Sequence, residues 1–459
     1  MTDAAKPAEE ILSDLVKKAH VQVRSSGELV TCIAGEVSAE NERREEKKLA
    51  VLRRRDGFRA LSERGVGRTV ELTPWQVLHA IGRGLVLARQ GAGRGLAEHW
   101  QSLKYCQALD RDRGGYLALS GEGRNPERYY KATQSSEIGI GFALVVAEQL
   151  LKKRYPDHVV SVIDSDIALQ AGWPLKNKGQ AKGKRPEALL RRPNFLLEVW
   201  RPGEPSRVFE VASKGTHGKP AQVYSQLEKG TAHLDAVHIG RYGQTPSLLI
   251  GTELAEKGGI VVHILEAPGN VLLRPGSKEP EEPNLDAKLD EGNESTLMTM
   301  HSGWDGGDLN NYGFQVKAEK FGWFSQVLAR SEAAALMAFT GGGRPTAQYL
   351  TREQGKRFFD IPAYAGADSV SDAEHRICGI DFSGTDHVFR LNKTRVEAFS
   401  GLADGLYNRL QQGRLADCRR EVYAMQPELE FADGDPEWGP VSVRPDGTVM
   451  AIRVLPPTV

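Results

Sequence analysis

The sequence has no long apolar run and no basic start followed by an apolar stretch. No segment approaches the about 18 apolar residues that a membrane-spanning helix needs, and Asp3, Glu9 and Glu10 stand near the beginning of the chain. A secretory signal pairs a basic segment with an apolar one. The sequence therefore predicts a cytoplasmic protein that neither crosses a membrane nor is secreted.

Cysteine is scarce, and several catalytic motifs are missing. Cys32, Cys106, Cys378 and Cys418 are far apart and form no Cys or Cys/His cluster at zinc-binding spacing. They are predicted to be reduced structural thiols. The sequence contains no G-x-S-x-G motif, and the glycines at 341–343 follow a predicted helix and lack the GK[ST] of a phosphate-binding loop.

Excess charge of one sign is also absent. Lys and Arg number 60, and Asp and Glu number 60, over 459 residues. This balance excludes a uniformly basic surface, so any nucleic-acid site must be a local patch. A chain of this length has room for about three domains.

Composition divides the chain into four predicted segments. Residues 1–125 are predicted to be mainly helical, with one helix over 7–18 and another that Thr73 caps and Pro74 begins. Residues 126–268 alternate helical and β-branched runs. Residues 269–297 carry several prolines and seven acids from Glu279 to Glu294, which favours a linker. Residues 298–459 are predicted to form an α+β domain that ends in a hairpin around Asp446-Gly447.

The segment 126–268 shows a distinctive order of elements. Ser135 and Ser136 are predicted to cap a helix that Tyr155-Pro156 ends. A buried strand is predicted over 158–163, and strands over 195–200 and 208–212 should form an antiparallel hairpin. A helix over 221–233 and strands over 237–239, 247–250 and 259–265 follow. The predicted fold class is α/β.

This order covers roughly residues 133–266 and resembles the restriction-endonuclease-like, PD-(D/E)xK nuclease superfamily. The local match consists of Arg192-Pro193-Asn194-Phe195-Leu196-Leu197 and, one hairpin later, Val208-Phe209-Glu210-Val211-Ala212-Ser213-Lys214-Gly215. The resemblance implies a central mixed sheet flanked by helices. It also implies a site for Mg²⁺ or Mn²⁺, because carboxylates that hold a hard cation can activate water for phosphodiester hydrolysis.

The resemblance assigns roles to five residues. Asn194 stands at the position of the family's metal-binding Asp, and Glu210 is the nearest acid upstream of Lys214. Lys214 would orient the water and offset developing negative charge. Glu137 matches a helix-borne Glu, and Gln226 is the candidate on the next helix. The implied metal ligands are Glu210 and Asn194.

Two positions depart from the family's motif. Asn194 is neutral, and the family's acid lies two residues before the lysine, where this chain has Ala212. On a regular strand Glu210 and Lys214 would lie roughly 13 Å apart, so joint action would need a bulge at Ala212-Ser213. Glu198, Asp164 and Asp166 are alternative carboxylates.

A basic loop precedes the hairpin. Between residues 176 and 192 one acid, Glu187, accompanies seven basic residues: Lys176, Lys178, Lys182, Lys184, Arg185, Arg191 and Arg192. Clustered Lys and Arg bind phosphates without reading sequence, so these seven are the predicted nucleic-acid-binding residues; a solvated insertion is the alternative. The spacing of His217, His233 and His238 indicates no metal pair.

Three functions remain open. The first is a DNA-acting protein with an Mg²⁺- or Mn²⁺-dependent endonuclease domain, which the resemblance places in bacterial defence, restriction or repair. The second is a non-catalytic protein that binds nucleic acid or a partner through a decayed nuclease fold, which Asn194 and the displaced Glu210 favour. The third is an assembly protein that acts through residues 298–459. A protein partner or a homo-oligomer is compatible with each.

Overall fold

The computed structural model describes most of the chain. The described ranges are 6–62, 67–87, 100–127, 129–171, 191–241, 243–255, 258–274, 283–289, 299–301, 313–359, 372–430 and 434–456. None of the helices within these ranges is long and apolar enough to cross a membrane.

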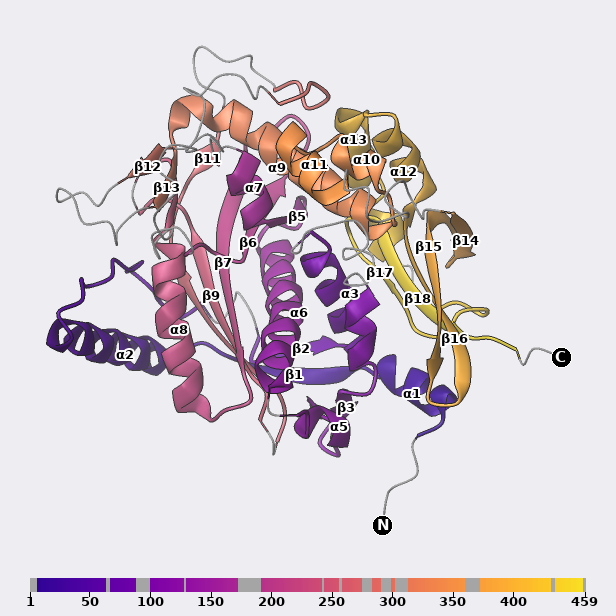
Figure 1. Ribbon diagram of the computed structural model, residues 1–459, viewed down its shortest axis with the longest axis horizontal. Helices are drawn as coiled ribbons and strands as arrows, with labels where there is room; N and C mark the ends of the chain where they lie inside the picture. Colours follow the sequence, from indigo (N-terminus) through magenta and orange to yellow (C-terminus); the bar gives the residue numbers. More distant parts are fainter. Residues whose placement is uncertain are drawn as a thin grey trace.

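A mixed sheet of eight strands lies at the centre (Figure 1). Its strands are β1 (Ala19–Arg24), β2 (Thr69–Leu72), β5 (Val159–Asp164), β6 (Phe195–Trp200), β7 (Ser206–Thr216), β9 (Ser247–Glu253), β10 (Val261–Ala267) and β11 (Leu272–Leu273). The order is β2–β1–β10–β9–β7–β6–β5, and β11 pairs with β7 beside this path. β5, β6 and β7 are antiparallel neighbours, and β9 is parallel to β7. The predicted α/β class and the hairpin are therefore confirmed.

Helices cover both faces of this sheet. α6 (Tyr130–Arg154) lies on one face, where a Cβ at Gly139 would come within 3.0 Å of the Cα of Gly215. α8 (Pro220–Leu234) lies on the other face, where a Cβ at Gly230 would meet the Cβ of Ala212 at 3.6 Å. α3 (Pro74–Leu85) packs on α6, and α2 (Gly27–Glu46) packs on α8. Figure 1 shows these layers in order across the molecule.

The predicted start of the helix is confirmed for α3 and wrong for α6. Thr73 caps α3 in a capping box with Gln76, and Pro74 is the first helical residue, as predicted. α1 (Ala8–Leu15) falls inside the predicted range 7–18. α6, however, begins at Tyr130 and not at the serines predicted to cap it. The Ser135 hydroxyl donates to the carbonyl of Ala132 within the helix, so it bonds the preceding turn and caps nothing.

The C-terminal part contains an antiparallel sheet of five strands. These are β14 (Ala373–Ile377), β15 (Ile380–Leu391), β16 (Thr394–Ala403), β17 (Val441–Val443) and β18 (Thr448–Val454), in the order β14–β15–β16–β18–β17. The predicted hairpin around Asp446-Gly447 joins β17 to β18. α9 (Phe321–Phe339) contacts β16 and ends just before Gly341, whose φ of +81° suits a helix terminus.

Shorter elements complete the described fold. Two small sheets pair β3 (Leu109–Arg111) with β4 (Leu117–Leu119), and β12 (Thr299–His301) with β13 (Gly313–Val316) and β8 (Val237–Ile239). The remaining helices are η1 (Trp100–Tyr105), α5 (Gly121–Arg124), α7 (Ser165–Ala171), η6 (Ala318–Lys320), α10 (Arg344–Ala347), α11 (Arg352–Phe359), α12 (Asp404–Gln411), α13 (Leu415–Ala424) and α14 (Gln426–Glu430).

The predicted segments pack against one another and contribute to the same sheet and the same apolar cluster. β1 and β2, from residues 1–125, extend the sheet of residues 126–268. One apolar cluster includes Leu12 on α1, Phe142 on α6 and Phe399 on β16. The described parts of 269–297 include β11, which pairs with β7. The boundaries at 125, 268 and 297 stay predictions.

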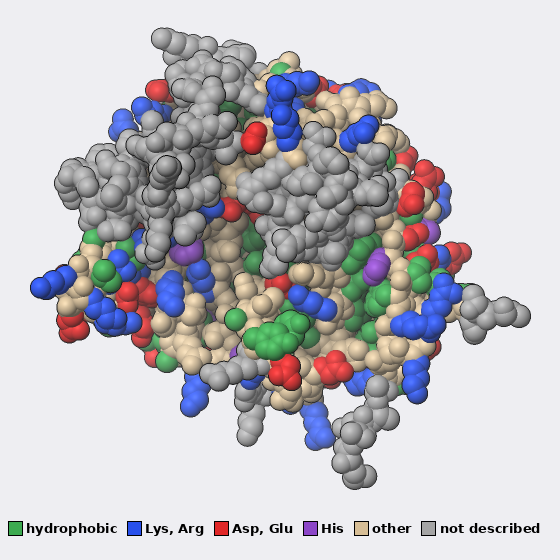
Figure 2. Space-filling model, viewed as in Figure 1, with side chains coloured by type: hydrophobic (Ala, Val, Ile, Leu, Met, Phe, Trp, Pro, Cys, Tyr) green, Lys and Arg blue, Asp and Glu red, His purple; other side chains and the backbone are tan. Residues whose placement is uncertain are grey.

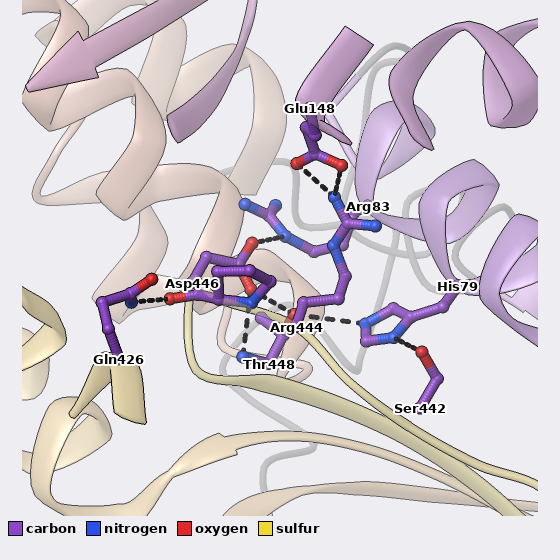
Figure 3. Close-up of polar contacts among 9 residues, drawn as sticks. His79, Arg83, Glu148, Gln426, Ser442, Arg444, Asp446 and Thr448 are labelled. Atoms are coloured by element: carbon purple, nitrogen blue, oxygen red, sulfur yellow. Dashed lines mark hydrogen bonds and ion pairs between the residues drawn. The ribbon is translucent and has the colours of Figure 1, made fainter. Parts of the chain in front are cut away.

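Buried polar groups also join α3 and α6 to the hairpin β17–β18 (Figure 3). Arg83 on α3 donates to Asp446 at 2.9 Å, and Arg444 pairs with Glu148 on α6. The His79 ring lies 3.0 Å from the Ser442 hydroxyl. Buried ions are stable only when they are paired, so this network fixes the hairpin against the two helices.

Candidate functional site

A polar cavity of about 680 Å³ lies at the carboxyl end of β7, beside the first turns of α6 and α8. It is lined by Lys131, Ala132, Ser135, Ser136, Asn194, Ser213, Lys214, Gly215, Thr216, His217, Gly218, Gln222 and Gln226. Three of the five residues that the resemblance assigned, Asn194, Lys214 and Gln226, therefore meet here. Among the described lining residues there is no carboxylate.

Lys214 is the central cation of this cavity. It stands near the end of β7 and is half-buried, with its Cε beside Gly230 of α8. Burial and the neighbouring Lys229 lower the pKa of its ammonium. In the described part of the chain no acid forms an ion pair with it. A shielded ammonium without a counter-ion favours an anionic ligand.

Asn194 is held firmly by the neighbouring strand. Its side-chain carbonyl accepts a hydrogen bond from the Ser213 backbone N–H at 2.8 Å, and its own N–H donates to the Val211 carbonyl at 2.8 Å. The side-chain oxygen implied as a metal ligand is therefore engaged by the backbone of β7. The amide nitrogen of the same side chain remains a donor for an anion in the cavity.

Gln226 reaches the cavity from the first half of α8. Pro220 begins this helix, and Gln222 and Gln226 lie one turn apart on the side that lines the cavity. Neutral amides can both donate and accept hydrogen bonds, so they suit phosphate oxygens as well as bases.

Glu137 does not line the cavity. It is buried on α6, where it accepts a hydrogen bond from the Tyr105 hydroxyl at 2.7 Å and pairs with Lys104 at 2.6 Å. Burial and this carboxylate raise the pKa of the Tyr105 hydroxyl. Glu137 thus anchors the η1 helix to α6.

Glu210 is separated from Lys214 along β7. The register with β9 is continuous from Glu210↔Ser247 to Thr216↔Glu253, so the bulge considered at Ala212-Ser213 is absent. Glu210 is buried and accepts a hydrogen bond from the Ser247 hydroxyl at 3.0 Å. Burial raises the pKa of its carboxyl well above the usual range, although Arg55 opposes that shift.

The alternative carboxylates also have other partners. Glu198 forms a buried ion pair with Arg419 at 3.0 Å, and that guanidinium lies 3.9 Å over the ring of Trp200. Asp164 accepts a hydrogen bond from the Ile167 N–H at 3.0 Å, and burial raises its pKa to about 7. Neither lines the cavity.

Most of the basic loop lies outside the described residues: Lys176, Lys178, Lys182, Lys184 and Arg185. Of its last two members, Arg192 pairs with Asp166, and its carbonyl lies 3.0 Å from Nδ1 of His233. Arg191 is half-buried. On the face shown in Figure 2, basic and acidic side chains of the described residues are interspersed.

A separate group of possible metal ligands lies on the C-terminal sheet. Ligand atoms of His375, Asp386 and Glu397 lie within 4.8 Å of one another. Arg453 already pairs with Glu397 at 2.6 Å, and His375 lies 3.1 Å from Asp386. This arrangement is a histidine-containing ion-pair cluster, and it differs from the oxygen-rich sites that Mg²⁺ prefers.

Sequence reasoning missed the contribution of α6 to the cavity. Lys131, Ser135 and Ser136 line it, whereas the two serines were predicted only as caps. The spacing i, i+4 of Lys131 and Ser135 placed them on one helix face, but only a helix that starts as early as Tyr130 includes both.

The fold and the cavity define an α/β protein with a lysine-containing site at a strand end, whose described lining residues include no acid. Comparison with protein-family models, with curated proteins and with solved structures finds no match.

Proposed function

We propose that this protein binds nucleic acid through the cavity at the end of β7, and that the domain is a restriction-endonuclease-like fold without hydrolytic activity. The observation that carries the proposal is Lys214, a half-buried cation in a cavity whose described lining residues include no acid. A phosphate diester is the anion that the proposed restriction-endonuclease-like fold would be expected to bind at such a site. DNA is the first candidate ligand, because the resemblance is to DNA-acting enzymes.

The two helix starts beside the cavity support phosphate binding. Neither α6 nor α8 has a side chain that caps its first N–H groups within the described chain. Free N–H groups and the helix dipole attract anions. Lys131 on α6 and Gly218 just before α8 both line the cavity, so these helix ends face the same space as Lys214.

The order of elements supports the restriction-endonuclease-like assignment. α6 is followed by three antiparallel strands, then by α8 and by β9 parallel to β7. This is the order from which the resemblance was inferred. In the family a Pro-Asp lies at the start of one strand and an acid-x-Lys on the next; that Asn194 directly precedes β6 and Lys214 lies on β7 supports the proposal.

Metal-dependent endonuclease activity is the second candidate. It is favoured by the meeting of Asn194, Lys214 and Gln226 in one cavity. It would need Mg²⁺ or Mn²⁺ held by a carboxylate, whereas Glu137 and Glu210 are engaged elsewhere. A role in bacterial defence, restriction or repair in the cytoplasm, which the resemblance implies, is compatible with either candidate, and so is action with a protein partner or as a homo-oligomer.

The test compares Lys214→Ala with Lys317→Ala, which removes an exposed lysine that does not line the cavity. Fluorescence anisotropy with labelled DNA and RNA at several salt concentrations measures binding. We expect Lys214→Ala to weaken binding about tenfold, which is about 1.4 kcal/mol. The slope of the logarithm of the binding constant against the logarithm of the salt concentration should also become shallower, by the amount that corresponds to about one phosphate contact. Lys317→Ala should behave as the native chain.

The same proteins are then incubated with plasmid and single strands in Mg²⁺ or Mn²⁺. Cleavage that Lys214→Ala abolishes would replace the binding proposal with the endonuclease candidate. If the native chain fails to bind DNA and RNA even at low salt, both candidates fail. Assembly through the C-terminal part would then be the remaining interpretation.

A further inference from the structure

Two tyrosines stand in solvent at the start of α6. Tyr129 and Tyr130 are 72% and 54% exposed, and they are the only exposed residues among the Phe, Tyr and Trp whose burial the structure describes. Their ring centroids lie 4.3 Å apart with an angle of 36° between the planes. Aromatic rings usually bury most of their surface, so two neighbouring exposed rings mark an interaction surface.

This tyrosine pair directly precedes residues that line the cavity, although neither tyrosine is among those lining residues. Lys131 and Ala132, which follow it directly, both line the cavity. Tyr129 precedes Ala132 by three residues, which is just under one helical turn and about 4.5 Å along the axis. The start of α6 therefore carries both the exposed rings and residues of the cavity that Lys214 also lines.

The chemistry of this pair fits unstacked bases. Aromatic side chains bind bases by stacking, and they do so without regard to sequence. In a continuous duplex each base already stacks on its neighbours, so the faces of its bases are hidden. A single strand offers a base for the rings and, next to it, a phosphate for a lysine.

We propose that Tyr129 and Tyr130 form a stacking platform for unpaired bases, and that the cavity holds the adjoining phosphate. The ligand class is therefore single-stranded nucleic acid or a frayed end, in preference to a continuous duplex. This inference rests on the proposed function and names its substrate.

The experiment uses the full chain and a fluorescent single strand of about 12 nucleotides. A matched strand with abasic sites at its central positions keeps the phosphates and removes the bases, and a closed hairpin duplex has no unpaired ends. Four proteins are compared: the native chain, Tyr129→Ala/Tyr130→Ala, Tyr129→Phe/Tyr130→Phe and Lys214→Ala. Thermal unfolding verifies that each is folded.

The native chain should bind the intact strand about tenfold more tightly than the abasic strand and the duplex. The alanine pair should lose this preference and bind both strands as the native chain binds the abasic one. The phenylalanine pair keeps the rings and should retain the preference. Lys214→Ala should weaken binding of both strands while preserving the ratio between them.

Equal binding of the intact and abasic strands by the native chain would overturn the platform and leave the proposed function standing. So would an alanine pair that keeps the native preference, because the rings would then serve another contact, such as one with a protein. Absence of binding to every strand at low salt would overturn the proposed function and this inference together.

Discussion

Glu332 on α9 is a buried acid whose charge opposes folding. It is only 6% exposed and lies near Arg419, Glu198 and Ser161. Burial raises its pKa from 4.5 to about 7, although Arg419 and a hydrogen bond with Ser161 partly offset that rise. The folded state therefore holds the proton more tightly than the unfolded state, so the unfolding free energy falls as the pH rises from about 4.5 to about 7.

Glu332→Gln should remove this pH dependence. Near pH 5 the variant and the native chain should be similarly stable, whereas at pH 8 the variant should be more stable by about 1–3 kcal/mol. Urea unfolding at both pH values measures the difference. Glu319→Gln, which removes an exposed carboxylate just before α9, is the control. A stability difference of the same size at both pH values would contradict a buried titrating acid.

At the scale of single residues, the sequence predicted some members of the site and not others. Asn194 and Lys214 line the cavity, and they stand near the ends of strands whose pairing the turn at 201–205 made clear. Glu137 and Glu210 lie outside the cavity and contact Tyr105 and Ser247, which are 32 and 37 residues away in the sequence. A local sequence pattern does not show which polar group from a distant part of the chain a buried carboxylate will contact.

At the scale of elements, the crossing of α6 over β7 depends on glycine. Because residue 215 is a glycine, the backbone of α6 can approach β7 closely. A Cβ added at Gly215 would overlap the carbonyl oxygen of Ser135 on α6. Gly215→Ala should therefore push α6 away from the cavity and destabilise the fold by about 1–3 kcal/mol or more. Denaturant unfolding measures the loss, and the anisotropy assay should show weakened binding.

Gly35→Ala is the matched control. Gly35 is exposed within α2, and a Cβ there would have no neighbour within 4 Å. Alanine favours the helix, so this change should stabilise the protein by about 0.5–1 kcal/mol. If Gly215→Ala were as well tolerated as Gly35→Ala, the close approach of α6 to β7 would not be needed.

The elements themselves were predicted best where their signals are local. β6 matches its predicted range, and Thr73-Pro74 fixes the start of α3. α2 ends at Glu46, within the part of the chain that was predicted to be mainly helical. Arg53, Arg54 and Arg55 then bind the far end of α8 and the loops beside β9, and these contacts replace helical ones.

At the scale of the whole molecule, the sequence did not reveal how distant segments combine. β1 pairs with β10, which lies more than two hundred residues further along, so residues 1–125 complete the central sheet. Trp75 on α3 donates to the carbonyl of Met450 on β18 at 2.8 Å. Such pairings follow from the burial of every apolar face, which composition and periodicity do not specify.

These contacts predict that the described fold unfolds as one unit. Arg83 and Asp446 form a buried ion pair, and Arg83 and Arg444 hold the pKa of the Asp446 carboxyl well below its usual range. Arg83→Met should lower the free energy of unfolding by about 3–5 kcal/mol, because it removes the main partner of the Asp446 carboxylate. Adding Asp446→Asn should recover part of the loss, since the buried charge is then gone.

The ion pair of Arg376 and Asp381 is exposed, so Arg376→Met should change stability by less than about 1 kcal/mol.

Urea unfolding followed by circular dichroism and by tryptophan fluorescence distinguishes one unit from two. The fluorescence of the seven tryptophans, which include Trp75 between α3 and β18, reports on tertiary packing, so both signals should change at the same urea concentration in the native chain. Arg83→Met should shift both transitions together. If instead the variant showed two separate transitions while Arg376→Met showed one, the C-terminal part would be an independent domain that the ion pair only joins to the rest. Coincident transitions would mean that the hairpin β17–β18, although far from the cavity in the sequence, stabilises α3 and α6 and through α6 the cavity itself.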